Sequence, residues 1–215
     1  LASLFYNRGV FVRKDQHAVE RVRQLFSQAL YYSYPVGMAD YCVDKEKWQT
    51  ARKPYALFFH GTTWANKHWP IAYWKSLASM LRQQGMAVKL SWGSDDEREA
   101  SQVIADDVEG IDILPDLNVE GLMPVIANAK AVVAVDTGLG HLAAALNIPT
   151  VALFGPTDPE KTGLMGEKQV NLVADFSCAP CLKRECGFRG ESPVWPACFA
   201  TVTPERVMAQ LKQLV

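Results

Sequence analysis

Short apolar runs alternate with amphipathic segments along most of the chain. Six apolar runs bounded by Gly, Pro or polar residues have the length of buried strands, the last as a candidate only: residues 54–60, 86–92, 111–114, 130–136, 149–155 and 168–174. Between or after them, apolar residues recur at helical spacing: residues 70–85, 94–108, 118–129, 138–147 and 203–215. Strands that alternate with helices over short connections predict an α/β fold with a parallel sheet and helices on both faces.

The N-terminal part of the chain lacks this alternation. Residues 15–33 carry apolar residues at helical spacing, and Asp15 stands where an N-cap is expected. Residues 34–53 contain Pro35, Gly37 and mixed charge, which is typical of a linker. We therefore expect a helix and a linker in front of the regular α/β region.

Polar and Gly-rich residues gather directly after the predicted strands. Ligands of a parallel α/β sheet bind outside the carboxyl ends of its strands, so these residues are the candidate site. They are Thr62, Thr63 and Lys67 after the first strand, Glu97 after the second, Asp136, Thr137, Gly138 and His141 after the fourth, and Gly155 to Thr157 after the fifth. Their convergence at one edge of the sheet supports a binding site more strongly than any single motif does.

Residues 137–141 open a predicted helix, and this position favours an anion site. The first amides of a helix have no intrahelical partner and carry partial positive charge. Gly138 would let a phosphate approach the backbone, while Thr62 and Thr63 add hydroxyls and Lys67 adds a cation. The chain has neither a GxxxxGK[ST] motif nor a GxGxxG after the first strand, so this is neither a P-loop nor a dinucleotide fingerprint.

Each candidate also has a purely structural interpretation. Thr137 could cap the helix, with the glycines around it serving close packing alone. Asp136 could contact a sugar hydroxyl or cap the same helix, and His141 could contact a phosphate or bond nearby backbone. Glu97 could accept both hydroxyls of a ribose or be a solvated charge at a helix start.

Charge and hydropathy narrow the range of partners. The 215 residues carry a formal net charge of -1, so no basic field indicates nucleic acid. No apolar run approaches the ~18 residues of a membrane-spanning helix. The acidic pairs at residues 95–96 and 106–107 could hold Mg²⁺, but consecutive acids on a helix surface are usually solvated. We expect no required cofactor.

The five cysteines are unevenly distributed. Cys178, Cys181, Cys186 and Cys198 form a Cys-x2-Cys-x4-Cys-x11-Cys pattern within a segment rich in Pro, Gly and Trp. Four thiolates suit a tetrahedral structural zinc, although the last two spacings fit no standard finger. Reduced thiols and disulfides remain the alternatives.

Three stretches resemble glycosyltransferase family 9, the lipopolysaccharide heptosyltransferases, and most of all its heptosyltransferase I branch. They are HGTTWANKHWP at 60–70, LSWGSDDERE at 90–99 and VDTGLGHLAAALNIPTVALFGPTDP at 135–159. The stretch at residues 5–26 is similar to a mid-chain segment of that family. The combination of TT-x3-K-HWP with DTG-x2-H-L is specific, and the resemblance covers nearly the whole chain except about residues 175–200.

The resemblance implies the C-terminal half of a glycosyltransferase B-type fold. Residues 1–45 would belong to the N-terminal domain and interdomain linker. Residues 46–215 would form a Rossmann-like nucleotide-sugar-binding domain with a cysteine-rich insertion at 175–200. The implied reaction moves heptose from ADP-heptose to the Kdo-lipid A core of lipopolysaccharide with inversion, at the cytoplasmic face of the inner membrane.

The resemblance also implies roles for the residues after the first strand. Thr62, Thr63 and Lys67 would contact the donor diphosphate, and Lys67 would stabilise the leaving group. The family's presumed general base, an Asp, lies in the N-terminal domain, and no residue here matches it. We therefore expect this chain to bind the donor and to need the N-terminal domain for transfer.

At the other strand ends, Glu97 would hold the adenosine ribose and Asp136 would meet the heptose. Thr137, Gly138 and His141 would complete the phosphate end. Other functions stay open: the chain could be a non-catalytic nucleotide-binding module that acts with a partner chain. A nucleotide-sugar epimerase would need acid and base carboxylates within the chain, and none is placed convincingly.

Overall fold

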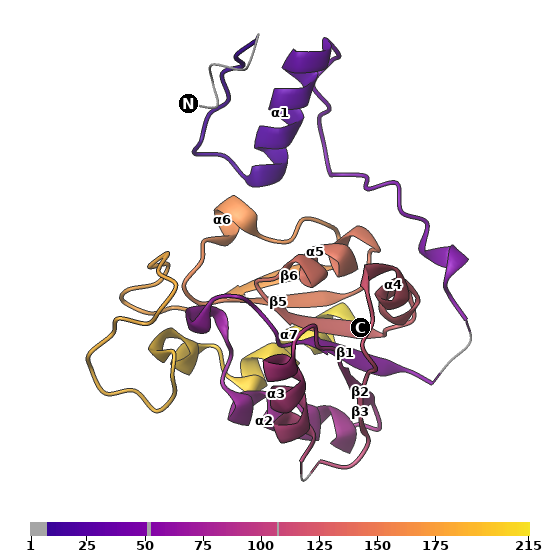
Figure 1. Cartoon of the computed structure of the whole chain (residues 1–215), viewed down its shortest axis with the longest axis vertical. Coiled ribbons are helices and arrows are strands. Elements are labelled where there is room, and N and C mark those ends of the chain that lie inside the picture. The colour runs from indigo at the N-terminus through magenta and orange to yellow at the C-terminus, as the bar shows by residue number, and fades with distance from the viewer. Residues whose placement is uncertain (1–7, 51–52, 107) are drawn as a thin grey trace.

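A six-stranded sheet forms the centre of the molecule. The computed structural model describes residues 8–50, 53–106 and 108–215. All neighbouring strands pair in parallel, in the order β3-β2-β1-β4-β5-β6 (Figure 1). The strands are β1 (Tyr55–Phe59), β2 (Ala87–Leu90), β3 (Ile111–Ile113), β4 (Ala131–Val135), β5 (Thr150–Phe154) and β6 (Gln169–Val173). The predicted parallel α/β sheet is confirmed, including its sixth strand.

Helices cover both faces of the sheet, as predicted. One apolar layer packs the sheet against α2 (Ile71–Gln83), α3 (Asp95–Ala105) and α7 (Pro204–Leu214). The other packs it against α4 (Val119–Ala127) and α5 (Gly138–Ala145). Alternate residues of each central strand pack into the two apolar layers. Both sets of residues are therefore apolar, and each of these strands appears in the sequence as a continuous apolar run.

The strand order places a crevice at the ends of β1 and β4. From β1 the chain runs through α2 to β2 and through α3 to β3, moving away from β4. Helix α4 then returns it to β4 on the opposite side of β1. Loops after β1 and β4 therefore diverge, and ligands of open α/β sheets bind at this reversal of strand order.

Capping side chains set several helix starts, and one predicted cap is wrong. Ser94 accepts a hydrogen bond from the Glu97 amide at the start of α3, and Thr203 caps α7 in the same way. Helix α1 (Ala18–Leu30) is capped by the ring of His17, not by Asp15. Asp15 lies too far ahead of the first helical residue and pairs with Arg13 instead, at 2.5 Å.

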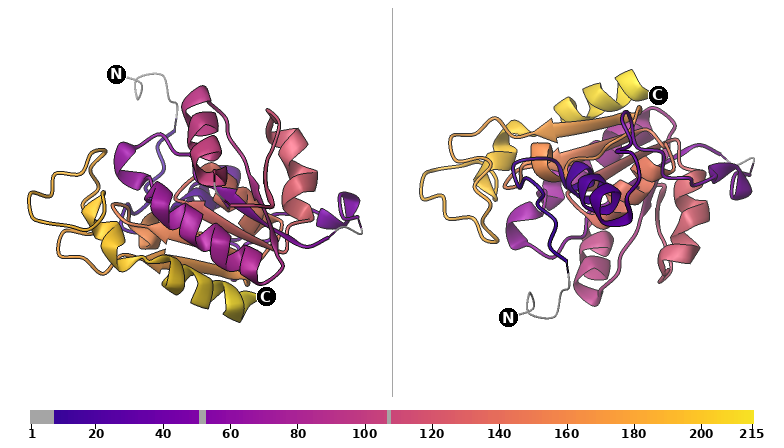
Figure 2. Two further views of the ribbon diagram at one scale, coloured as in Figure 1. Left: turned by 90° about the horizontal axis from the view of Figure 1, so that it is seen from below. Right: turned by 90° about the horizontal axis from the view of Figure 1, so that it is seen from above.

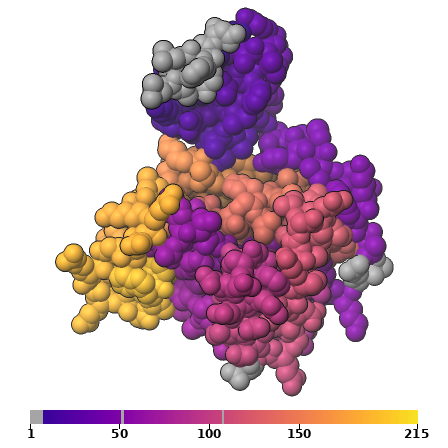
Figure 3. Space-filling view, in the orientation of Figure 1, coloured from indigo at the N-terminus to yellow at the C-terminus, as the bar shows by residue number. Residues whose placement is uncertain are grey.

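The N-terminal segment stands at one end of the sheet domain (Figures 1 and 3). It touches the domain near the short helix α6 (Pro159–Thr162), where Lys161 donates to the Asp15 carbonyl at 2.6 Å. The described residues of the expected linker are irregular apart from a 3-10 turn, η2 (Lys45–Lys47), and residues 51–52 lie outside the described part. Within the described ranges, every helix is too short or too polar to span a lipid bilayer.

The cysteine-rich segment is a long irregular excursion from the sheet (Figure 2). It has no helix or strand until the 3-10 turn η4 (Ala197–Thr201). Sequence reasoning treated residues 175–200 as a single insertion, but Cys198 and Phe199 are buried in the core that carries α2 and α7. Phe176 and Ala179, before η4, also pack against that core.

Candidate functional site

A cleft of about 920 Å³ opens where the strand order reverses. The loops after β1, β2, β4 and β5 all contribute to its walls. All eight residues that the sequence nominated for the donor line this one cleft: Thr62, Thr63, Lys67, Glu97, Asp136, Thr137, Gly138 and His141. The sheet therefore brings together residues that lie up to eighty positions apart in the chain.

The start of α5 is open toward the cleft. Thr137 is its N-cap residue, but the threonine hydroxyl makes no capping bond to the helix. Thr137 thus occupies the cap position that the structural interpretation gave it, but its hydroxyl stays available to a ligand. A Cβ added at Gly138 would meet no atom within 4 Å, whereas one at Gly140 would lie 3.2 Å from the Cβ of Ala134. Gly140 thus serves packing against β4, while Gly138 leaves space in front of the helix amides.

A lysine–aspartate pair spans the cleft between the ends of β1 and β4. Lys67 Nζ lies 2.8 Å from Asp136 Oδ2, and their side chains are 16% and 9% exposed. Lys67 lies in the 3-10 turn η3 (Ala65–Lys67), and its ammonium also stands 4.6 Å from the ring centroid of Trp64. The ion pair fixes the position of the Lys67 ammonium in the cleft, close to the start of α5.

The Glu97 carboxylate is held by backbone on the opposite side of the cleft. The Gly93 amide donates to Glu97 Oε2 at 2.7 Å, and the Glu97 amide donates to the Ser94 hydroxyl. A Cβ at Gly61 would overlap this carboxylate, so the absence of a side chain there makes room for it. Glu97 is half-buried and fixed, unlike the free surface charge that its acidic neighbours suggested.

A buried histidine supports the helix that carries Glu97. The ring of His60, which is 3% exposed, lies 2.7 Å from the Ser101 hydroxyl, and Ser101 donates to the Glu97 carbonyl at 3.0 Å. Because the single hydroxyl proton goes to that carbonyl, Nε2 of the ring is the donor to Ser101. Burial lowers the pKa of His60 to about 4, with nearby His68 acting in the same direction, so the ring is neutral at pH 7.

His141 lines the cleft one turn into α5. Burial lowers its pKa below the ordinary value, and nearby His17 and Lys67 add to this effect, while the Asp136 carboxylate opposes it. A neutral imidazole can donate one hydrogen bond and accept another. This side chain is therefore suited to bonding a polar ligand without adding charge.

Sequence reasoning missed several walls of the cleft. Asp158 and Lys161, at the start of and within α6, line it, as does Leu182 from the cysteine-rich segment. Thr157 also lines it, and its buried hydroxyl has no hydrogen-bond partner among the described residues. The sequence had already placed Thr157 in the candidate site at the end of the fifth strand, whereas nothing in it placed Leu182 beside the donor residues.

The described residues contain no group of three or more His, Cys, Asp or Glu side chains arranged to hold a metal ion. Asp95, Asp96 and Asp106 are exposed, as expected for solvated charges, and Asp107 lies outside the described residues. All five cysteine thiols are free. Burial, together with the neighbouring thiols of the cysteine-rich segment, raises the pKa of Cys198 to about 12.

The chain matches known proteins over its whole length. The family profile described as Glycosyltransferase family 9 (heptosyltransferase) matches residues 1–191. The chain is 48% identical to lipopolysaccharide heptosyltransferase 1 of Pseudomonas aeruginosa, over 100% of this chain and 64% of that protein. It is 43% identical to lipopolysaccharide heptosyltransferase 1 of Escherichia coli K12, over 79% of this chain and 54% of that protein.

Solved structures agree with the sequence matches. E. coli heptosyltransferase WaaC with ADP superposes with a TM-score of 0.81 at 35% identity, over 100% of this chain and 62% of that one. WaaC with ADP-2-deoxy-2-fluoro heptose gives a TM-score of 0.75, over 61% of that chain. This chain thus spans less than two thirds of the length of these relatives. The family match and these identities together show that the chain belongs to glycosyltransferase family 9, the heptosyltransferases.

Proposed function

We propose that this chain is the donor-binding part of an inverting heptosyltransferase, which moves heptose from ADP-heptose to the Kdo-lipid A core of lipopolysaccharide. The observation that carries the proposal is the convergence of all eight nominated residues on one cleft, in front of the open start of α5. Two structures of one relative support the choice of donor, since WaaC is known with ADP and with ADP-2-deoxy-2-fluoro heptose.

The cleft suits a reaction that expels a nucleoside diphosphate. Negative charge grows on the leaving oxygen as the glycosidic bond breaks, and donors already in place stabilise that charge without reorganisation. Lys67 supplies the cation, the first amides of α5 supply partial positive charge, and Thr62, Thr63 and Thr137 supply hydroxyls. In this proposal these groups bind the diphosphate and neutralise its charge, so that no metal is required in the cleft.

The remaining residues divide between the two ends of the donor. Glu97, held over Gly61, would accept hydrogen bonds from the ribose hydroxyls of adenosine. Asp136 would turn from Lys67 toward a heptose hydroxyl when the diphosphate takes the lysine. His141 would complete the phosphate end as a neutral donor.

The proposal assigns no general base to this chain. Deprotonation of the acceptor and binding of Kdo-lipid A fall to the N-terminal domain of the enzyme. The enzyme would act as a peripheral protein at the cytoplasmic face of the inner membrane, where its lipid-linked acceptor is made.

Calorimetric titration of this chain with ADP, UDP and NAD tests the proposal. We expect selective binding of ADP, which weakens in Lys67→Ala and is unchanged in Lys89→Ala. Lys89 is a matched control because it forms a similar pair with Asp112, at 3.0 Å, away from the cleft. If the chain is folded but does not bind ADP, the assignment of this cleft as the donor site is refuted.

A transfer assay separates an enzyme part from a non-catalytic binding module. The chain would be joined to the N-terminal half of the P. aeruginosa relative, and release of ADP from ADP-heptose would be followed with a Kdo-lipid A acceptor. Turnover that depends on Lys67 supports the heptosyltransferase. Tight ADP binding without any turnover would favour the module.

A further inference from the structure

The four clustered cysteines surround a second cavity, of about 240 Å³, which Asn66 of η3 also lines, next to Lys67 of the donor cleft. Cys178, Cys181, Cys186 and Cys198 all line it. We propose that this cavity binds one thiophilic divalent cation, with zinc as the expected metal, through the thiolates of these four cysteines.

The set of side chains suits such an ion. Thiolates select zinc over harder cations, and four of them complete the tetrahedron of a closed structural site. Cys178 and Cys181 have the Cys-x2-Cys spacing of a metal-binding turn, and all four thiols are free. The fifth cysteine, Cys42, is exposed in the N-terminal segment and does not line the cavity.

The groups around the sulfurs also fit a charged metal centre. Four thiolates with one Zn²⁺ leave two net negative charges, and Lys183 and Arg189 line the same cavity. The side-chain amide of Asn66 donates to Cys181 Sγ at 3.4 Å, which is the kind of outer bond that orients metal ligands. The amide oxygen of this residue, which is 1% exposed, is buried without a partner among the described residues.

The sulfurs line the cavity and do not meet at one point, in line with the absence of a grouped metal-ligating set among the described side chains. A change of χ1 rotamer moves a cysteine sulfur by about 3 Å, and the proposal requires such rotations to gather the four sulfurs. Cys178, Cys181 and Cys186 lie where no helix or strand restrains the backbone, which makes such an adjustment inexpensive in packing. Cys198, buried in η4, is the fixed point of the set.

Metal binding would add to the hydrogen bonds that hold this segment to the domain, such as that from the Leu182 amide to the Pro156 carbonyl at 2.8 Å. Between β6 and η4 the chain forms neither helix nor strand, and its ring contact is the edge-on pair of Phe176 and Phe188. Since a site of this kind does not exist in the unfolded segment, the free energy of metal binding becomes stability of the folded segment.

The same segment is bonded to the donor cleft. The Asn66 amide donates to the Arg184 carbonyl at 2.9 Å, and its side chain donates to the Lys183 carbonyl at 3.0 Å. Asn66 directly precedes Lys67 in η3, and Arg184 also stands over the Trp64 ring, 5.6 Å from its centroid. A metal at the four cysteines therefore supports the turn that carries Lys67, a consequence that rests on the proposed function.

Metal content of this chain is the direct test. The chain would be purified with reductant, stripped with a chelator, and reconstituted separately with Zn²⁺ and Co²⁺. We expect one zinc per chain by elemental analysis, and visible cobalt bands with the thiolate charge-transfer absorption of a tetrahedral sulfur site. Cys178→Ser should weaken metal binding about tenfold or more, and Cys42→Ser should leave it unchanged.

Three results would overturn the metal site: no zinc uptake after reconstitution, equal zinc affinity in Cys178→Ser, or a purified chain whose mass reveals disulfides among these cysteines. Cys178 is exposed, so its replacement by Ser is not expected to unfold the core. The metal readout does not depend on ADP and therefore fails or succeeds separately from the proposed function. Loss of ADP affinity on metal removal, restored by zinc, supports the coupling through Asn66, and unchanged ADP affinity refutes that coupling alone.

Discussion

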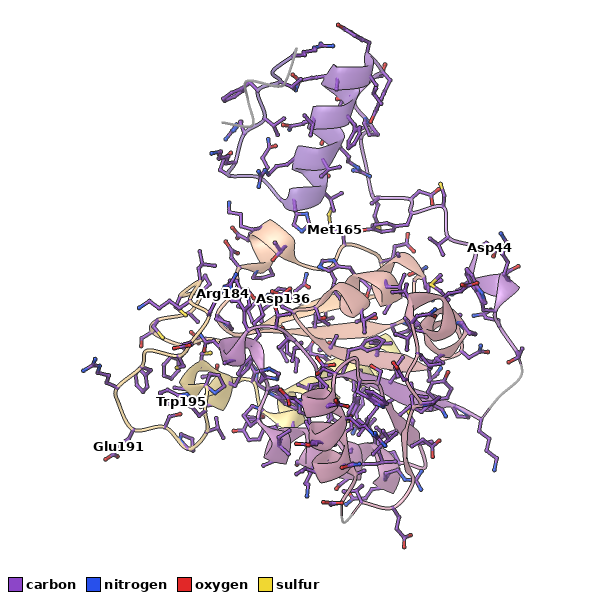
Figure 4. All side chains as sticks on the ribbon, in the orientation of Figure 1. Asp44, Asp136, Met165, Arg184, Glu191 and Trp195 are labelled. Carbon is purple, nitrogen blue, oxygen red and sulfur yellow. The ribbon has the colours of Figure 1, made fainter. Side chains whose placement is uncertain are left out.

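The donor cleft and the cysteine cavity are both lined by residues of the short turn η3, yet they are built in different ways. The cleft is assembled from the ends of central strands, so its residues are placed by a backbone that the hydrophobic core already holds. The cavity is assembled mainly from a segment without regular structure. Figure 4 labels Asp136 in the cleft and Arg184 on the adjoining part of that segment.

Because of this difference, we expect ligand affinity and folding stability to respond separately to substitutions. Substitutions in the cleft should change donor affinity with little effect on the core, whereas substitutions in the cavity should change the order of the segment first. The four predictions below test how complete that separation is.

The largest expected effect is at Lys67. Loss of a charge-assisted hydrogen bond costs about 1.5–3 kcal/mol, so Lys67→Ala should weaken ADP binding about 10- to 100-fold by calorimetry. The Asp136 carboxylate, left without its 2.8 Å partner, would add repulsion toward the diphosphate. The double variant Lys67→Ala/Asp136→Asn removes that repulsion. Full recovery of ADP affinity in the double variant would mean that the lysine only neutralises Asp136.

The second effect concerns His60 beneath the cleft. Its pKa in the folded chain is about 4, below the ordinary value of 6.5, so below pH 6.5 the unfolded chain binds a proton that the folded chain does not. The free energy of unfolding should therefore fall by about 1.4 kcal/mol per pH unit between pH 6.5 and 4, or about 2 kcal/mol by pH 5. Urea titrations of the parent chain and His60→Gln at pH 7 and 5 isolate this contribution. Equal pH dependence in both would show that His60 titrates normally.

The third effect is at Gly61. A Cβ there would displace the Glu97 carboxylate from its place beside the Gly93 amide. We expect Gly61→Ala to weaken ADP binding about tenfold through lost ribose contacts, while pyrophosphate, which has no ribose, binds as before. Gly9→Ala is the matched control, since its added Cβ meets nothing within 4 Å. An equal loss for both ligands would place Glu97 away from the ribose.

The smallest effect is at Gly138. Its Cβ would enter the open space before α5, so Gly138→Ala should weaken ADP binding about fivefold, a steric cost of about 1 kcal/mol. The melting temperature should not fall, because no protein atom lies within 4 Å of that Cβ. Gly140→Ala should show the reverse pattern, since its Cβ would press on Ala134 in β4. Similar behaviour of the two variants would contradict the division between binding and packing.

Sequence reasoning reached the strand ends because their meeting is a consequence of topology. Once alternating strands and helices predict a parallel sheet, residues such as Thr62 and Thr137 must share one edge, whatever the details of packing. Ser94 and Thr203 are of the residue types that favour the N-cap position, and both cap their helices. The wrong cap at Asp15 arose because a cap depends on the first helical residue, which periodicity places only to within a turn.

The sheet, its two helical layers and the set of residues at the strand ends could all be predicted from the amino-acid pattern. The pairing of Lys67 with Asp136, the place of Glu97 over Gly61 and the contact of Asn66 with the cysteine-rich segment became visible in the folded chain. These two groups of features differ in the sequence distance over which they act. Strand and helix patterns follow from neighbours along the chain, whereas these contacts join side chains that only the folded sheet and its loops bring within hydrogen-bonding distance.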